Sequence, residues 1–90
     1  MKIKLSLTAP EYAPLIVNYD DWFHENHAYS LEWGYPVLPG KGQFIAFSFI
    51  ADLIKEHIDI IKLPAHWEIV DIHWNQENNT VIPTLFVVGK

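Results

Sequence analysis

The fold is decided by HWEIVDIHW at residues 66–74, NQENN at 75–79 and TVIPTLFVV at 80–88. Two runs rich in β-branched and aromatic residues flank a polar turn, which is the pattern of a β-hairpin. Asparagine tolerates positive φ, so Asn78 and Asn79 are expected as the two central residues of the turn. The sequence therefore predicts a C-terminal β-hairpin.

A two-residue turn also assigns the two faces of this hairpin, because side chains alternate along each strand. One face is wholly apolar, with the opposed pairs Trp74 and Pro83, Ile72 and Leu85, and Val70 and Val87. The other face is mixed, with Ile69, Asp71 and His73 opposite Val88, Phe86 and Thr84. A mixed face is too polar for a dry core and too apolar for an ordinary wet surface. We expect it to meet a partner.

The longest helical pattern runs from Gln43 to Lys62. Its apolar residues recur at spacings of three and four, as a buried helix face requires. They are Phe44, Phe47, Ala51, Ile54, Ile58 and Ile61. Pro64 ends the pattern, because proline disfavours a helical conformation in the residue before it. We expect one long helix that covers the apolar face of the sheet, including Trp74.

The N-terminal half completes the sheet. Residues Lys2 to Thr8 alternate as a half-exposed strand, and Leu15 to Tyr19 is a candidate second strand after two prolines. A short helical turn is expected from Asp20 to His27, followed by an extended segment from Tyr29 to Trp33. The expected fold is a single α+β domain of residues 1–90, with a small antiparallel sheet of three to five strands and one long helix packed on one face.

Charge and composition exclude several classes of function. Six basic and eleven acidic residues give a formal charge of −5, which argues against binding to a phosphate backbone. The chain has no cysteine, so disulfides, thiolate metal sites and cysteine nucleophiles are excluded, and a reducing cytoplasm suits it. No continuous apolar run has the length of a signal peptide or a membrane span. We expect neither a nucleic-acid nor a membrane partner, and no cofactor.

His24 and His27 are the best candidates for metal ligands. Residues three apart on a helical turn project to one side, and Asp20, Asp21 and Glu25 supply carboxylates nearby. The spacing does not match that of a zinc protease, which needs two histidines four apart with a glutamate after the first. The alternative interpretation is a solvated polar turn between aromatic anchors.

Two further motifs have weaker chemistry. Gly40-Lys41-Gly42 precedes the expected helix but lacks the spacing and the hydroxyl of a phosphate-binding loop, which favours a simple turn. Asp71 and His73 lie two residues apart on one strand, about 7 Å between Cα atoms, which we expect to be too far for a direct hydrogen bond. With Thr84 they are candidates to hold a polar ligand, although no nucleophile motif supports catalysis.

The sequence favours a small, non-enzymatic protein-binding or accessory protein, such as an inhibitor or an immunity-type protein. Its expected contact surface is acidic and rich in aromatic side chains, which supply desolvation energy while carboxylates select a basic partner. The expected contact residues are Trp67, Asp71, His73 and Phe86 on the sheet and Asp20, Asp21, Trp22 and Glu25 in a loop.

Two alternatives stay open. One is a small-molecule or divalent-metal site built from His24, His27, Asp71 and His73. The other concerns the partner, which is either another protein or a second copy of the chain. If the apolar strand from Thr80 to Val88 lies at the edge of the sheet, we expect a homodimer through that strand.

Overall fold

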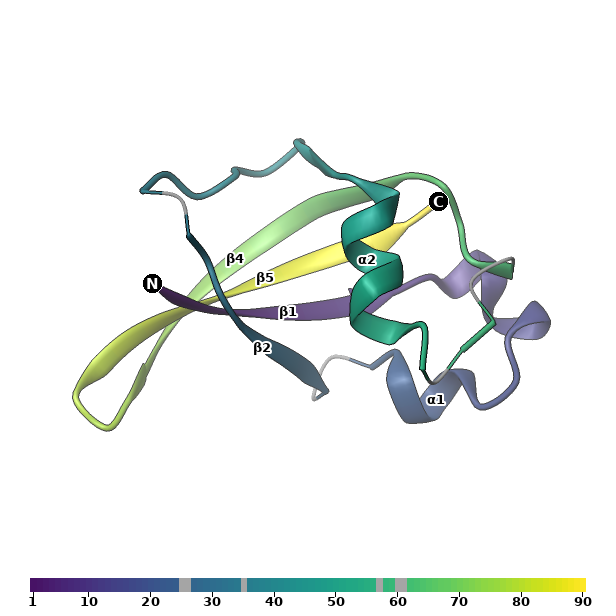
Figure 1. Ribbon diagram of the computed structural model, residues 1–90, viewed down its shortest axis with the longest axis horizontal. Coiled ribbons are helices and arrows are strands. Elements are labelled where there is room, and N and C mark those ends of the chain that lie inside the picture. Colours follow the sequence, from purple (N-terminus) through teal and green to yellow (C-terminus); the bar gives the residue numbers. More distant parts are fainter. Residues whose placement is uncertain (25–26, 35, 57, 60–61) are drawn as a thin grey trace.

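The computed structural model describes residues 1–24, 27–34, 36–56, 58–59 and 62–90. Five strands form one sheet, curled into a half-barrel, and the helices of these described residues are all short (Figure 1). In chain order the elements are β1 (Lys2–Thr8), η1 (Pro10–Leu15), α1 (Tyr19–Trp22), β2 (Ala28–Glu32), β3 (Phe44–Ile45), α2 (Phe47–Ile54), β4 (Trp67–Glu77) and β5 (Thr80–Gly89). The order across the sheet is β2, β1, β5, β4, β3.

The C-terminal hairpin is present with the turn that its asparagines predict. Asn78 and Asn79 adopt φ angles of 48° and 66°, in the left-handed region that a primed two-residue turn needs. The distal pairs follow the predicted register, since Trp74 lies opposite Pro83, Ile72 opposite Leu85 and His73 opposite Thr84. Turn chemistry therefore sets the register at this end of the sheet.

A β-bulge at Val70 changes the register at the other end. Ile69, rather than Val70, lies opposite Val87, and the register shifts between Ile69 and Asp71. One extra residue exchanges the faces of everything on the far side of the bulge. Ile69 is consequently buried, whereas 41% of Val70 is exposed. The predicted pairing of Val70 with Val87 is wrong for this reason.

The bulge also determines the position of Trp67, which was expected on a contact surface. Trp67 is fully buried, and its indole Nε1 donates a hydrogen bond to the carbonyl oxygen of Pro64 at 2.8 Å. Its ring lies 6.3 Å from that of Phe23, nearly parallel to it. The predicted role of Trp67 as a contact residue is wrong, because the side chain belongs to the core.

The central strand of the sheet is β5. It pairs in parallel with β1, where Leu5 lies opposite Leu85 and Leu7 opposite Val87, and it pairs antiparallel with β4 on its other side. The sheet is therefore mixed and not purely antiparallel. From Thr84 to Val88 both sides of β5 are paired, so β5 is not the edge strand on which the expected homodimer depends.

The expected long helix from Gln43 to Lys62 is wrong as well. Its first residues form β3, with Phe44 opposite Glu68 and Ile45 opposite Trp67, and α2 then spans eight residues. Aromatic and β-branched residues favour a strand at 44–45, and the isoleucines at 58, 60 and 61 have low helix propensity. Ile61, expected on the buried helix face, lies outside the described residues.

The aromatic-rich N-terminal half seals the core. The predicted strand from Leu15 to Tyr19 is instead the end of η1 and the start of α1, because Pro10 and Pro14 favour a tight helical turn. Tyr19 accepts a hydrogen bond from the Ala9 N–H at 2.8 Å. The buried core is formed by Ile3, Leu5, Leu7, Ala9, Ile16, Phe23, Ile45, Ile50, Ile54, Ile58, Leu63, Trp67, Ile69, Leu85 and Val87.

Helix α2 covers only part of the sheet. Its eight residues span about 12 Å, while the eleven residues of β4 span about 36 Å. The closed end of the β4–β5 hairpin therefore projects beyond the helices (Figure 1). We call residues 71–86 the distal hairpin. Across the described residues, no helix has both the length and the apolar composition needed to cross a bilayer.

Candidate functional site

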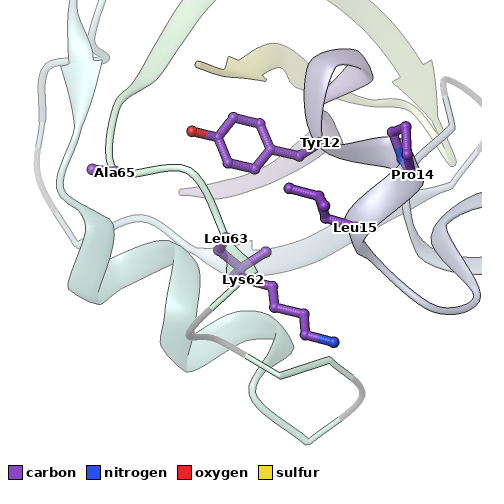
Figure 2. Close-up of a pocket in the computed structure, with 6 residues that line it drawn as sticks. All are labelled: Tyr12, Pro14, Leu15, Lys62, Leu63 and Ala65. Carbon is purple, nitrogen blue, oxygen red and sulfur yellow. The ribbon is translucent and has the colours of Figure 1, made fainter.

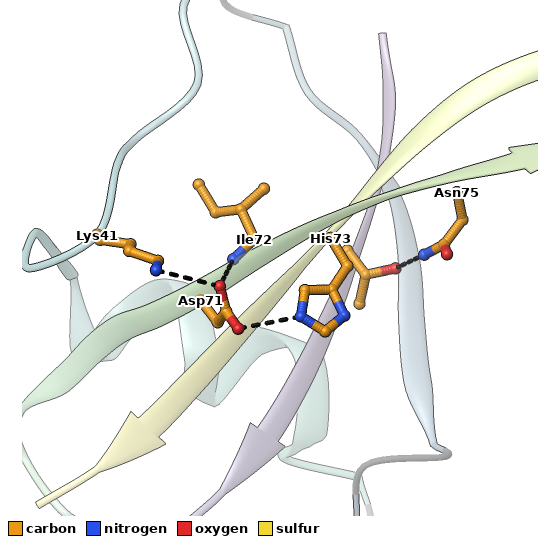
Figure 3. Close-up of polar contacts among 6 residues, drawn as sticks. Lys41, Asp71, Ile72, His73 and Asn75 are labelled. Carbon is orange, nitrogen blue, oxygen red and sulfur yellow. Dashed lines mark hydrogen bonds and ion pairs between the residues drawn. The ribbon is translucent and has the colours of Figure 1, made fainter.

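The outer face of the distal hairpin, away from α2, carries the mixed side chains that the sequence predicts. Asp71 and His73 of β4 lie opposite Phe86 and Thr84 of β5. This pairing brings a carboxylate, an imidazole, a phenyl ring and a hydroxyl together on one surface. Figure 3 shows the carboxylate of Asp71 and the imidazole of His73 side by side. The prediction that Asp71, His73 and Phe86 share a face is confirmed.

Asp71 and His73 bond to each other directly. The distance from His73 Nε2 to Asp71 Oδ2 is 3.0 Å, so the expectation that two strand residues at this spacing are too far apart is wrong. Side chains lean along a strand, and the imidazole spans the gap that the Cα separation leaves. The imidazole also contacts Phe86, with ring centroids 4.6 Å apart at 60°. Phe86 thus supports the ring from the neighbouring strand.

The other oxygen of Asp71 completes a small polar cluster. Asp71 Oδ1 accepts a hydrogen bond from the Ile72 N–H at 2.9 Å and lies 3.4 Å from Lys41 Nζ (Figure 3). The hydrogen bond from His73 lowers the pKa of Asp71 most, the Ile72 N–H lowers it further, and Lys41 adds a smaller contribution. The carboxylate is therefore held in its charged form, with three donors around it.

Lys41 reaches this cluster because of the turn that contains it. Gly42 adopts a φ of 84°, and its N–H donates to the Ile69 carbonyl oxygen at 2.8 Å. That bond ties the loop to the edge of β4 at Ile69, two residues before Asp71. The sequence contains no signal for this contact, because it depends on a pairing between segments far apart in the chain.

Neighbouring polar groups on the same face satisfy one another. Asn75 Nδ2 donates to Thr84 Oγ1 at 3.2 Å, and Lys4 Nζ donates to Glu77 Oε1 at 2.8 Å. Among the described residues, no hydroxyl hydrogen-bonds to His73.

The candidate metal ligands lie elsewhere. The rings of His24 and His27 are 5.7 Å apart, and His27 packs edge-on against Tyr29 at 4.9 Å. Within the residues that the structure describes, no three His, Cys, Asp or Glu side chains come together as a metal-binding group. The structure does not bring His24 and His27 together with Asp71 and His73 as one ligand set.

The acidic-aromatic loop is also separate from the distal hairpin. Asp20, Asp21 and Trp22 belong to α1, which lies near the end of the sheet opposite the β4–β5 turn (Figure 1). Glu25 lies outside the described residues. Trp22 is half-buried and packs against the core, and Tyr29 donates to its carbonyl oxygen at 3.4 Å. Burial raises the pKa of Tyr29 to about 12.

A hollow of about 670 Å³ lies between η1 and residues 62–65 (Figure 2). It is lined by Tyr12, Pro14, Leu15, Lys62, Leu63 and Ala65. In Figure 2 the Tyr12 hydroxyl points toward Ala65, whereas the Lys62 ammonium points away from it. A ligand site needs polar groups that converge on one position. This hollow does not provide that arrangement.

The exposed apolar side chains of the distal hairpin complete the site. Trp74 is 60% exposed and Val81 is 57% exposed, although both belong to strands that also contribute residues to the core. Sequence reasoning assigned Trp74 to the covered face and therefore missed it as a contact residue.

Comparisons with family models, curated proteins and solved structures find no match to this chain.

Proposed function

We propose that this protein is a non-enzymatic protein-binding module whose contact surface is the distal hairpin. One observation supports the proposal above all others: a two-stranded element projects past the helices with Trp74 and Val81 exposed. Large apolar side chains on a preorganised surface are typical of binding hot spots. The exposed tryptophan leaves apolar surface in contact with water in the free protein, and a bound partner would bury that surface.

The outer face of the same hairpin supplies selectivity. Asp71 is a charged carboxylate at the surface, and the chain carries a formal charge of −5. Complementary charge speeds association and discriminates against wrong partners more than it adds affinity. His73 and Phe86 add two aromatic rings, in contact with each other, beside the carboxylate. A partner with basic and apolar side chains suits this combination, as expected for an inhibitor, an immunity-type protein or an accessory subunit.

The contact residues of the proposal differ from the initial set. Asp71, His73 and Phe86 stay, Trp74 joins them, and Trp67 leaves because it is buried. The expected loop residues are not part of this surface, since Asp20, Asp21 and Trp22 belong to α1 and Glu25 lies outside the described residues. We place this activity in the cytoplasm, since a chain without cysteine needs no oxidising compartment.

The test is affinity capture with the tagged protein and a matched pair of variants. One variant changes Trp74 and Val81 to serine on the distal hairpin, and the control changes Leu15 and Val17 to serine at η1 and the turn after it. The control side chains are 58% and 75% exposed, so both variants remove exposed apolar surface of similar size. We expect proteins captured by the native chain to be lost with the hairpin variant and kept with the control.

Folding must be checked before capture is interpreted. Exposed positions away from the core change stability little, so each of these substitutions should change the free energy of unfolding, measured by urea denaturation, by less than about 1 kcal/mol. A partner that binds the native chain and the hairpin variant equally well contradicts the proposal.

A further inference from the structure

We propose that the free edge of β4 pairs antiparallel with the same edge of a second copy of the chain, with His73 opposite His73 of that copy. The proposal goes beyond the function given above, because it concerns self-association through the edge of β4 and not the basic partner expected for the outer face. It follows from three features of β4: an unpaired edge, the direction of its backbone groups and the order of its side chains.

The edge of β4 is unpaired over the distal hairpin. Strand β3 pairs only with Trp67 and Glu68, and the loop before it exchanges backbone hydrogen bonds with Ile69 at 2.8 and 2.9 Å. Past Ile69, no described strand lies on this side of β4. An unpaired edge of this length offers a row of backbone donors and acceptors to another strand. Residues 70–77 are therefore the available segment.

The turn decides which backbone groups point outward. In a two-residue hairpin the residues flanking the turn, Glu77 and Thr80, form a hydrogen-bonded pair. From Glu77 backward along β4, the N–H and C=O groups of successive residues point alternately toward β5 and away from it. Alternation directs the N–H and C=O groups of Ile72, Trp74 and Gln76 toward the free edge. The Ile72 N–H agrees with this, because it bonds to the Asp71 carboxylate and not to β5 (Figure 3).

Symmetry restricts the register of two such edges. Opposite residues on antiparallel strands share a face, so the two-fold axis between identical strands passes beside a residue that faces its own copy. We call this residue the centre of the register. A centre at Ile72 would soon bring Asn75 against Ile69, whose edge the loop already occupies. Within residues 70–77, a centre at His73 pairs residues 70–76 and a centre at Trp74 pairs residues 71–77, whereas every other centre pairs fewer residues.

Charge decides between the two remaining centres. A centre at Trp74 places Asp71 opposite Glu77, and directly opposed like charges destabilise a strand pair. A centre at His73 places Asp71 opposite Asn75 instead. It also places Ile72 opposite Trp74, an apolar pair that occurs twice by symmetry. We therefore assign the His73-centred register, which buries the exposed indole of Trp74 against a half-buried isoleucine.

Asp71 limits the affinity of this pairing. Its carboxylate occupies the Ile72 N–H, which the second strand must take over. Pairing thus exchanges one hydrogen bond for another at this position, so the dimer forms at high protein concentration. Removal of the carboxylate frees the N–H, and Asp71→Ala should lower the dimer dissociation constant by on the order of fivefold.

Single cysteines test the register directly, because the natural chain contains none. In the assigned register residue 73 forms a non-hydrogen-bonded pair with its own copy, with Cα atoms about 4.5 Å apart, which lies within the range that a disulfide needs. After mild oxidation, His73→Cys should give a disulfide-linked dimer on a non-reducing gel. Asn75→Cys on the same edge and Ser30→Cys on the other edge strand, β2, should stay monomeric.

Sedimentation of chains without cysteine gives an independent measurement. We expect a reversible dimer that Asp71→Ala strengthens and that Gln76→Pro, which removes an outward N–H, weakens, while Gln76→Ala leaves it unchanged. Circular dichroism of each variant verifies the fold. Equal crosslinking at all three cysteine positions, or a monomer at every concentration for both the native chain and Asp71→Ala, overturns the inference. Those results leave the capture experiment to decide the proposed function separately.

Discussion

Trp67 and Trp74 lie on the same strand and face the same side of the sheet, yet one is fully buried and the other is 60% exposed. Both are large apolar residues in a strand with alternating faces, so strand pattern does not explain the difference. The helices explain it. Phe23 and Pro64 enclose Trp67, whereas α2 is too short to reach over Trp74. The covered part of the hairpin stabilises the fold, and the projecting part is available for contact.

The strongest test of this comparison replaces each tryptophan by alanine. Trp67→Ala leaves a cavity in the core and should lower the free energy of unfolding by about 3–5 kcal/mol. Trp74→Ala removes an exposed side chain and should cost less than about 1 kcal/mol. Urea denaturation followed by circular dichroism measures both values. Equal losses would show that Trp74 is covered in solution and would remove the distinction between the two parts.

Gly89 provides a second test on the covered side. A Cβ at this position would lie 2.9 Å from two ring atoms of Trp67 and would also contact the Pro64 ring. Gly89→Ala should therefore lower the free energy of unfolding by about 1–3 kcal/mol through overpacking. Gly34→Ala is the matched control, because nothing lies within 4 Å of its added methyl group. Thermal melts of the two variants should differ clearly, and similar melting temperatures would contradict the close packing around Trp67.

The turn tests the projecting side. Asn79 has a φ of 66°, which a β-branched residue adopts only with strain. Asn79→Val should lower stability by about 1–2 kcal/mol, while Asn79→Gly should keep or raise it because glycine adopts positive φ freely. Chemical denaturation of the pair measures the difference. If valine were tolerated as well as glycine, the register of the distal hairpin would not depend on this turn.

The smallest expected effect concerns Asp71. The pKa of this carboxyl is lowered from its ordinary value of 3.8, chiefly by the hydrogen bond from His73. A carboxyl whose pKa is lowered in the folded state stabilises the fold at pH values above its ordinary pKa. That stabilisation is lost as the pH falls through the lowered pKa of the folded state. The melting temperature of the native chain should slightly exceed that of Asp71→Asn at neutral pH, and the difference should vanish in acid. A difference that persists below the carboxyl range would show that charge is not its cause.

Local chemistry explains why the distal hairpin could be predicted from the sequence. The turn at Asn78 and Asn79 requires no contact outside the hairpin, and alternation then places Asp71 and Phe86 on one face. Strand β1 follows in the same way from its own alternation. Elements whose pattern and turn agree within a few residues were predicted correctly.

Contacts between distant segments explain the failures. The apolar spacing after Gln43 suits a helix, but Phe44 and Ile45 pair with β4. The first residues of the expected helix therefore form a strand. The bulge at Val70 adds one residue without any glycine or proline to mark it, and it moves Trp67 from the expected surface into the core. Strand propensity and apolar content are the same in either arrangement, so the sequence contained no basis for choosing between them.

The parallel pairing of β1 with β5 has a kinetic consequence. Lys4 lies opposite Thr84, so β1, which is synthesised before β5, cannot pair with it until residue 84 has been made. Contacts with so large a sequence separation slow folding. Until then β1 presents Ile3, Leu5 and Leu7 to solvent as an apolar stripe, which is a target for chaperones and for misassembly with other nascent chains.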